Sequence, residues 1–306
     1  MGEIDDIQCY GAVGEDLGQS ANWTWAPSDS LGRACAERRA DGIGDLSLPN
    51  GNNHNRANAK HDFSEMRGIS MKRFVFFVQG VVVALACASC GGGSGIGPEE
   101  IAKQEQRLRD DLPVDWSSYQ TGDYQQAIEF FANTLAEAEA FEGAESVLNE
   151  IKSEAHNGIG WSFFREQSLE DAWNSFQQAT RLNRSNVDAW VGWAGVALAR
   201  GRYADAAQFS AQALATGDGY NSAFRLDENN RQLGHDNIDS RHIRLMLAES
   251  YFQLGRYSVL DRPDPNNSAA QVRMIKGSYS YKDPGQLLRE MSEITLELQL
   301  EASGGF

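Results

Sequence analysis

Residues 201–210, GRYADAAQFS, contain the local pattern that decides the fold of this 306-residue chain. Related copies occupy residues 122–131 (GDYQQAIEFF) and 168–176 (SLEDAWNSF), and a shortened copy occupies residues 255–257 (GRY). In each full copy, an alanine lies three positions after a large apolar residue. Glycine just after a helix can take the left-handed conformation that ends it, and the small alanine side chain lets two helices cross closely. The copies therefore predict a series of antiparallel helical hairpins.

The spacing of the copies predicts the repeat length. Leu169 and Tyr203 occupy equivalent positions and lie 34 residues apart. The pattern resembles the tetratricopeptide repeat, a helix-turn-helix unit with this period. The positions that carry the resemblance are Ile159-Gly160, Phe163, Ala172, Phe176 and Ala179 in one unit and Trp190, Gly201, Tyr203, Ala206 and Ala213 in the next.

Departures from this period predict where the array is irregular. The first interval, from Tyr124 to Leu169, is 45 residues, which predicts longer helices or an extra turn near residues 141–143. The last interval, from Tyr203 to Tyr257, is 54 residues, and this excess over 34 predicts a polar insertion between the third and fourth copies. Pro113 lacks a backbone N–H, so we expect the helix that starts at Pro98 to end near Asp111. Pro263 and Pro265 should delay the next helix to about Asn267, and residues 286–300 should form an amphipathic cap.

The sequence thus predicts an all-α fold, an antiparallel helical-hairpin solenoid of three to four tetratricopeptide-like units. Helical repeats are expected in residues 98–215 and an inserted loop in residues 216–240. A degenerate fourth repeat and a C-terminal cap helix are expected in residues 241–306.

A candidate export signal occupies residues 71–89. Met71 is followed by the basic pair Lys72-Arg73 and by the largely apolar residues 74–86, and two small residues precede Cys90. This order is that of a signal peptide, and the apolar part is short for a membrane helix, which needs roughly 20 residues. A buried helix of a globular domain is the alternative, but such a helix would not end in Cys-Gly-Gly-Gly-Ser-Gly.

The stretch resembles bacterial lipoprotein signals, which end in small or aliphatic residues before a lipid-bearing cysteine. The resemblance implies lipid attachment at Cys90, with Cys87 as the second choice because Ala84-Leu85-Ala86 precedes it. Gly91 after the cysteine implies sorting to the outer membrane in Gram-negative relatives. We therefore expect a lipid-anchored protein of the cell envelope that faces the periplasm.

The regions beside the signal have no folding pattern of their own. Residues 90–97 are rich in glycine and predict a flexible tether. Residues 1–70 are rich in Gly, Asn, Asp and Ser, which predicts a disordered extension that lies upstream of the true start if translation begins at Met71. A genuine cytoplasmic extension is the alternative.

Composition restricts the partners and the cross-links. The formal net charge is −16, which disfavours nucleic acid because phosphates demand a basic face. The same charge disfavours electrostatic binding to anionic lipid, so membrane contact would come from the acyl chains. The four cysteines are Cys9, Cys35, Cys87 and Cys90, so cleavage before Cys90 leaves one and allows no internal disulfide.

A repeat stack presents a concave face lined by the first helix of each unit, and binding is its usual use. The resemblance implies that Trp161, with Asn157 and Arg165 one turn away on either side, holds an extended peptide. Packing of Trp161 and Phe164 against a neighbouring helix is the equally open alternative. The full set of predicted groove positions is Trp116, Tyr119, Asn157, Trp161, Phe164, Arg165, Asp188, Val191, Leu198, His242, Glu249 and Gln253.

Catalytic and metal motifs are not recognisable in the sequence. His235 and His242, with Asp236 and Asp239, match no metal-ligand spacing. Residues 227–234 lack the glycine that a calcium loop needs at its sharp turn. We expect no catalytic residue, no metal and no cofactor.

The leading functional hypothesis is a membrane-anchored lipoprotein that acts as a scaffold for an envelope protein or peptide. The alternative is an accessory lipoprotein that binds a small molecule or glycan, with residues 216–240 as a lid. An enzyme is the least favoured class.

Overall fold

The computed structural model describes residues 97–227, 229–258 and 264–302. The predicted extension at residues 1–70, the signal at residues 71–89, Cys87, Cys90 and nearly all of the tether lie outside the described residues.

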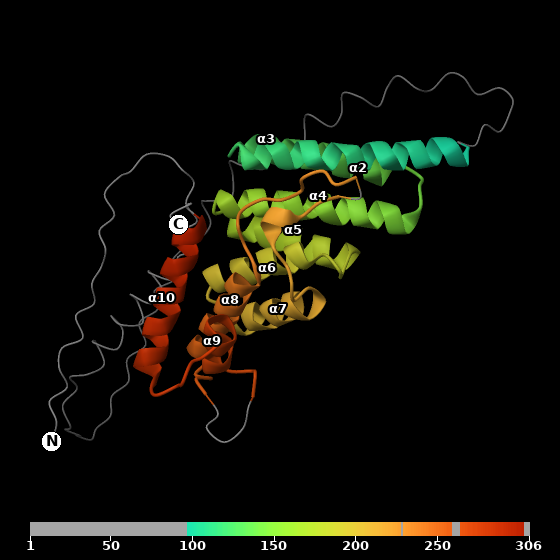
Figure 1. Ribbon diagram of the computed structural model, residues 1–306. Helices are drawn as coiled ribbons and strands as arrows, with labels where there is room; N and C mark the ends of the chain where they lie inside the picture. Colours follow the sequence, from blue (N-terminus) through green and yellow to red (C-terminus); the bar gives the residue numbers. More distant parts are fainter. Residues whose placement is uncertain (1–96, 228, 259–263, 303–306) are drawn as a thin grey trace, which may run out of the picture. The chain divides into compact units, whose positions relative to one another are not determined.

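Within that part, the chain is an all-α array of helical hairpins of the tetratricopeptide-like kind, as the sequence predicted (Figure 1). Each hairpin pairs a first helix with a second, and a final helix follows the last pair. The helices are α2 (Pro98–Gln120) with α3 (Tyr124–Ala140), α4 (Glu145–Arg165) with α5 (Leu169–Leu182), α6 (Val187–Ala199) with α7 (Tyr203–Thr216), α8 (Ser240–Gln253) with α9 (Ser268–Lys276), and α10 (Pro284–Ala302).

The turns inside the hairpins have one geometry. Gly122, Gly201 and Gly255 have φ of +84°, +68° and +73°, the left-handed region predicted for the residue that ends the first helix. Gln167 takes the same conformation in the second hairpin, with φ of +62°. The next amide bonds back across the turn in each case, as from Arg202 N–H to the Ala197 carbonyl at 2.8 Å. In the described hairpins one turn thus recurs four times, once without glycine.

Small side chains let neighbouring helices approach. Ala127, Ala172 and Ala206, the alanines of the repeated pattern, are fully buried. In the first helices, a Cβ added at Gly158 or Gly192 would come within 2.2 Å of a phenylalanine ring. These rings belong to the second helices, so the first helices need glycine at these crossings.

The first helix differs from the prediction that Pro113 ends it near Asp111, which is wrong. Helix α2 continues through Pro113 to Gln120. Proline at this position removes the amide that would bond to the Arg109 carbonyl. That carbonyl accepts a hydrogen bond from Arg231 Nη2 at 3.4 Å instead, which partly offsets the loss.

Two main cores hold the described array together. The larger runs from α2 to α8 and includes the fully buried rings of Trp116, Phe131, Trp161 and Phe176. The second joins α8, α9 and α10 through apolar residues such as Leu287 and Ile294. The Asn267 side chain caps α9 at the Ala270 amide, at the predicted start of that helix.

None of the helices in the described ranges is both long enough and apolar enough to cross a membrane.

Candidate functional site

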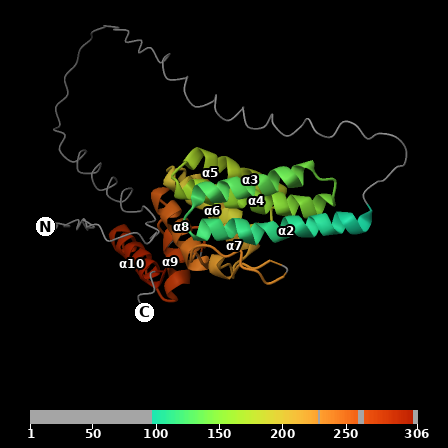
Figure 2. The same cartoon turned by 90° about the horizontal axis from the view of Figure 1, so that it is seen from above.

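The segment between α7 and α8, residues 217–239, lies across the first helices of the repeats; we call it the crossing segment. Figure 1 shows it passing over α4 towards α2 and returning to α8, and Figure 2 shows it alongside α2. It folds back on itself, with Leu233 N–H bonded to the Arg225 carbonyl at 2.9 Å and a short 3₁₀ turn at Ser222–Phe224. The described residues of the predicted insertion therefore pack on side chains of α2, α4 and α6 that were predicted to line a groove, and we call this face of the three helices the groove.

Asp188 of α6 lies at the centre of the groove and is 1% exposed. Arg225 Nη1 of the crossing segment donates to its Oδ2 at 2.8 Å, and His235 Nε2 lies 2.9 Å from both carboxylate oxygens. Asn157 Nδ2 donates to the same carboxylate at 2.6 Å, and Trp161 Nε1 at 3.2 Å. The Tyr220 hydroxyl also bonds to Asp188. Groove and crossing segment thus share one buried carboxylate.

Arg225 binds a second groove carboxylate. Its Nη2 donates to Glu154 Oε1 of α4 at 2.5 Å, and Trp116 Nε1 of α2 donates to the same oxygen at 2.8 Å. The guanidinium carbon lies 5.4 Å from the centre of the Trp116 ring, within cation–π range. Arg225 is therefore enclosed by two acids and an aromatic face.

The His235 ring lies among three aromatic rings of the groove. It stacks on Trp116 at 4.7 Å with an interplanar angle of 8°, and it lies 4.7 Å from the Trp161 ring. Tyr119 meets it edge-on at 5.6 Å. The predicted aromatic anchor therefore contacts a side chain of the same protein.

Asp236 forms the second polar contact of the crossing segment. Its carboxylate accepts a hydrogen bond from the Tyr119 hydroxyl at 2.7 Å and pairs with the Arg165 guanidinium. His235 Nδ1 lies 3.2 Å from the same carboxylate. The imidazole thus bridges Asp188 and Asp236.

The charges of this cluster depend on one another. Burial opposes ionisation of Asp188 and Asp236, but Arg225, His235 and Arg165 overcome it and lower the pKa of both carboxyl groups. Burial also opposes the charge of His235, but the two carboxylates overcome it and raise the pKa of its imidazole. Since both neighbours of the ring are ionised acceptors, we assign a proton to each ring nitrogen.

Six of the predicted groove residues come together around the crossing segment. They are Trp116, Tyr119, Asn157, Trp161, Arg165 and Asp188. Asn157 and Trp161 are fully buried, and Phe164 packs beside Trp161 with ring centres 6.0 Å apart. Contact of these side chains with a partner stays a prediction.

Other predicted positions have different surroundings. Val191 is fully buried in the larger core. His242 belongs to the capping box of α8, with its Nδ1 2.9 Å from Asp239 Oδ1. Glu249 lies further along α8, where burial raises the pKa of its carboxyl to about 7.

Sequence reasoning missed Glu154 of the groove and the crossing-segment residues that bind there, namely Tyr220, Arg225, His235 and Asp236. The insertion has a usable signal, since the apolar residues Tyr220, Leu233 and Ile238 are spaced through it and all three pack against the larger core. A second signal is Asp188 itself, because an acid predicted to lie on an inner helix face needs a cation beside it, and a nearby segment must supply that cation.

The cluster contains groups used in acid–base catalysis, but a substrate has no access to them in this structure. The side chains of His235, Asp188 and Asp236 are 0%, 1% and 7% exposed. A general base must lie within hydrogen-bonding reach of the proton that it removes. The arrangement therefore joins two parts of the chain and exposes no reactive group.

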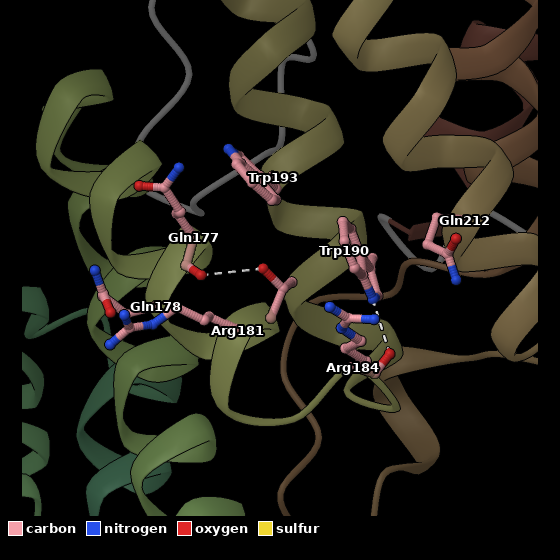
Figure 3. A pocket seen from close by; sticks show the side chains of 8 residues that line it. Gln177, Gln178, Arg181, Arg184, Trp190, Trp193 and Gln212 are labelled. Atoms are coloured by element: carbon pink, nitrogen blue, oxygen red, sulfur yellow. Dashed lines mark hydrogen bonds between the residues drawn. The ribbon is translucent and has the colours of Figure 1, made fainter.

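An open pocket of about 510 Å³ lies away from the groove, among α5, α6, α7 and the turn before α6 (Figure 3). Trp190 stacks on Trp193 at 5.6 Å, and Trp190 Nε1 donates to the Arg184 carbonyl at 2.9 Å. The pocket offers aromatic faces, amides and two guanidinium groups to a ligand. Its lining is Gln177, Gln178, Thr180, Arg181, Arg184, Trp190, Trp193 and Gln212.

Comparison with known proteins gives structural neighbours only. No family model matches the chain. No curated protein matches its sequence. A crystal structure of nearly identical tetratricopeptide-like repeats, assigned to a kinesin light chain of Podosopora anserina, is 14% identical over 64% of this chain and 98% of its own, with a TM-score of 0.38. A thermophilic tetratricopeptide repeat protein of Thermus thermophilus is 19% identical over 64% of this chain and 89% of its own, with a TM-score of 0.35.

Proposed function

We propose that the repeat array is a non-catalytic scaffold that binds a segment of another protein in the groove of α2, α4 and α6. The supporting observation is that these helices already hold a segment of the same chain. Carboxylates, an arginine and aromatic rings of the groove contact side chains of the crossing segment. A surface that binds one polypeptide segment in this way has the chemistry to bind another.

The anchor of the scaffold is proposed to be a lipid on Cys90, with Cys87 as the second choice, in the outer membrane facing the periplasm. Its support is the signal-like order of residues 71–89 and the glycine-rich residues that follow. Mass spectrometry of the native N-terminus tests it. A diacylglyceryl cysteine is the expected result, and a native chain that begins at Met1 without lipid would exclude the anchor.

The groove assignment is tested by cross-linking the full chain in cells and identifying the partners by mass spectrometry. Trp161→Ala combined with Arg165→Ala should reduce cross-linking of a specific partner at least tenfold. Trp190→Ala, which removes an aromatic ring outside the groove, is the matched control. Circular dichroism must show that both variants keep their helices, and equal recovery with the two would exclude the groove.

A second proposal is an accessory protein that binds a small molecule or glycan under residues 216–240. Its support is that the crossing segment covers the aromatic floor made by Trp116, Tyr119 and Trp161. Replacing residues 226–232 by a short turn distinguishes the two proposals. Loss of ligand binding supports the lid, whereas stronger binding of a protein partner supports the scaffold.

A further inference from the structure

We infer that the groove selects an extended peptide carrying arginine, and that the crossing segment is an intramolecular ligand that such a peptide displaces. This inference rests on the proposed scaffold function and names the chemical class of its partner.

The selection for arginine follows from the surroundings of Arg225. Asp188 and Glu154 lie on different helices and bind different nitrogens of its guanidinium, at 2.8 Å and 2.5 Å. The ring of Trp116 covers one face of the same group. Arginine matches this site because its planar guanidinium group donates hydrogen bonds in two directions and stacks on aromatic rings. Lysine has a single ammonium and would lose one of these contacts.

A second site in the groove fixes the direction of the peptide. Arg165 and the Tyr119 hydroxyl together bind the carboxylate of Asp236. The groove therefore offers an acidic site for arginine on α4 and α6 and a basic site for a carboxylate between α2 and α4. A partner that supplies both charges reproduces the polar contacts of the crossing segment.

The crossing segment has features of a ligand that can be exchanged. Phe224 and Leu226, which flank Arg225, are 78% and 50% exposed, so this stretch is held mainly by the side chain of Arg225, whereas Leu233 and Ile238 further along the segment are buried in the larger core. The groove also has an unused acceptor, since Asn157 Oδ1 is buried and accepts no hydrogen bond from the described residues. A peptide that donates to this oxygen gains a contact that the crossing segment does not make.

Competition within the chain sets the expected affinities. A tethered segment acts at an effective concentration of about millimolar, so an external peptide binds weakly while the segment holds the groove. Removing the anchoring side chains of the segment should therefore strengthen binding of the same sequence added in solution.

The test uses the full chain and a fluorescent synthetic peptide of residues 219–238. Binding is measured by fluorescence anisotropy for the wild type and for the variant Arg225→Ala, His235→Ala. We expect the variant to bind the peptide at least tenfold more tightly than the wild type. A second peptide with glutamine in place of Arg225 should bind the variant at least tenfold more weakly than the first, and one with lysine should bind with intermediate affinity.

Each outcome decides the inference. Absence of peptide binding by a variant with wild-type helicity would overturn the exchange, and equal binding of the arginine and glutamine peptides would overturn the selection. If the double variant loses helicity, Arg225→Lys replaces it, since lysine keeps the charge; loss of helicity there also would show that the segment is a fixed part of the core. The scaffold itself is tested separately, because cross-linking to a partner without arginine would still satisfy the proposed function.

Discussion

Asp188 is the residue on which the groove most depends. Five side chains of the described residues bond to its carboxylate, two from α4 and three from the crossing segment. A buried carboxylate is tolerated only when cations and donors compensate for the water that it loses. The same carboxylate holds Arg225 and His235 in place, so α4, α6 and the crossing segment stabilise one another.

Substitution of Asp188 by asparagine should therefore be strongly destabilising. Asparagine has nearly the same side-chain shape as aspartate but removes the negative charge that pairs with Arg225 and His235. Breaking a buried ion pair costs about 3–5 kcal/mol of unfolding free energy. Urea unfolding followed by circular dichroism measures the loss. The control is Asp205→Asn, in a surface pair with Arg202 at 2.6 Å, which should change stability by less than about 1 kcal/mol. Similar losses in the two variants would show that Asp188 is not buried as described.

The raised pKa of the Glu249 carboxyl predicts that the stability of the fold depends on pH. Burial raises the pKa of its carboxyl from 4.5 to about 7, so the folded state holds the proton more tightly than the unfolded state does. The stability that its protonated form provides is full below pH 4.5 and is lost as the pH rises through about 7. Glu249→Gln should therefore match the wild type near pH 4 and be more stable at pH 8 by about 1–3 kcal/mol. Thermal unfolding at both pH values measures this difference, and an equal difference at both would contradict it.

At the residue scale, sequence reasoning found one side of the contacts. Trp161, Asn157, Arg165 and Asp188 were predicted for the groove because the resemblance to tetratricopeptide repeats implies which helix positions face it. The other side, made by Arg225, His235 and Asp236, could not be predicted in the same way. Its positions have no period, and the pairing of His235 with Asp188 joins residues 47 apart in the sequence.

At the scale of the elements, the crossings between helices decide the array. Gly158 of α4 faces the ring of Phe131 on α3, and Gly192 of α6 faces the ring of Phe176 on α5. The same kind of crossing thus joins α3 to α4 and α5 to α6. A repeated close contact of glycine with phenylalanine sets the distance between successive helices.

The substitution Gly158→Ala tests this crossing. The added Cβ would come within 2.2 Å of the Phe131 ring, and since the ring is fully buried it can move little. We expect a loss of about 1–3 kcal/mol in unfolding free energy, typical of an overpacked core. Gly219→Ala is the control, because a Cβ there meets no atom within 4 Å. A loss of equal size in the control would contradict the explanation.

The hairpins were predictable at this scale because local rules fix them. Left-handed turns at Gly122, Gly201 and Gly255 follow from glycine beside a helix end, and the start of α9 follows from Asn267 after two prolines. The length of α2 was not predictable by the same rules. It passes Pro113 with help from Arg231, which comes from a segment more than a hundred residues later and is invisible to local reasoning.

At the scale of the whole array, the crossing segment changes how the repeats depend on one another. Repeats in a stack usually contact only their neighbours, so the ends of an array unfold more easily than its centre. Here the segment before α8 bonds to α2 through Asp236 and Tyr119 and through Arg231 and Asp110, at 2.7 Å in each case. The first and fourth hairpins are thereby linked without being neighbours in the stack.

This link predicts a specific pattern of amide hydrogen exchange. Asp236→Asn removes the charge that pairs with Arg165 and weakens the bond to Tyr119, so α2 should exchange about tenfold faster while α9 and α10 keep their protection. The control is Asp218→Asn, in the same segment, because Asp218 pairs at the surface with Arg244 of α8, at 2.5 Å. Mass spectrometry of peptic fragments measures exchange for each helix in both variants. If α2 were equally protected in the two variants, its stability would come from α3 and α4 alone and the array would be a simple stack of neighbours. Faster exchange confined to α2 in Asp236→Asn requires that the crossing segment, which leads into the fourth hairpin, stabilise the first hairpin through the groove.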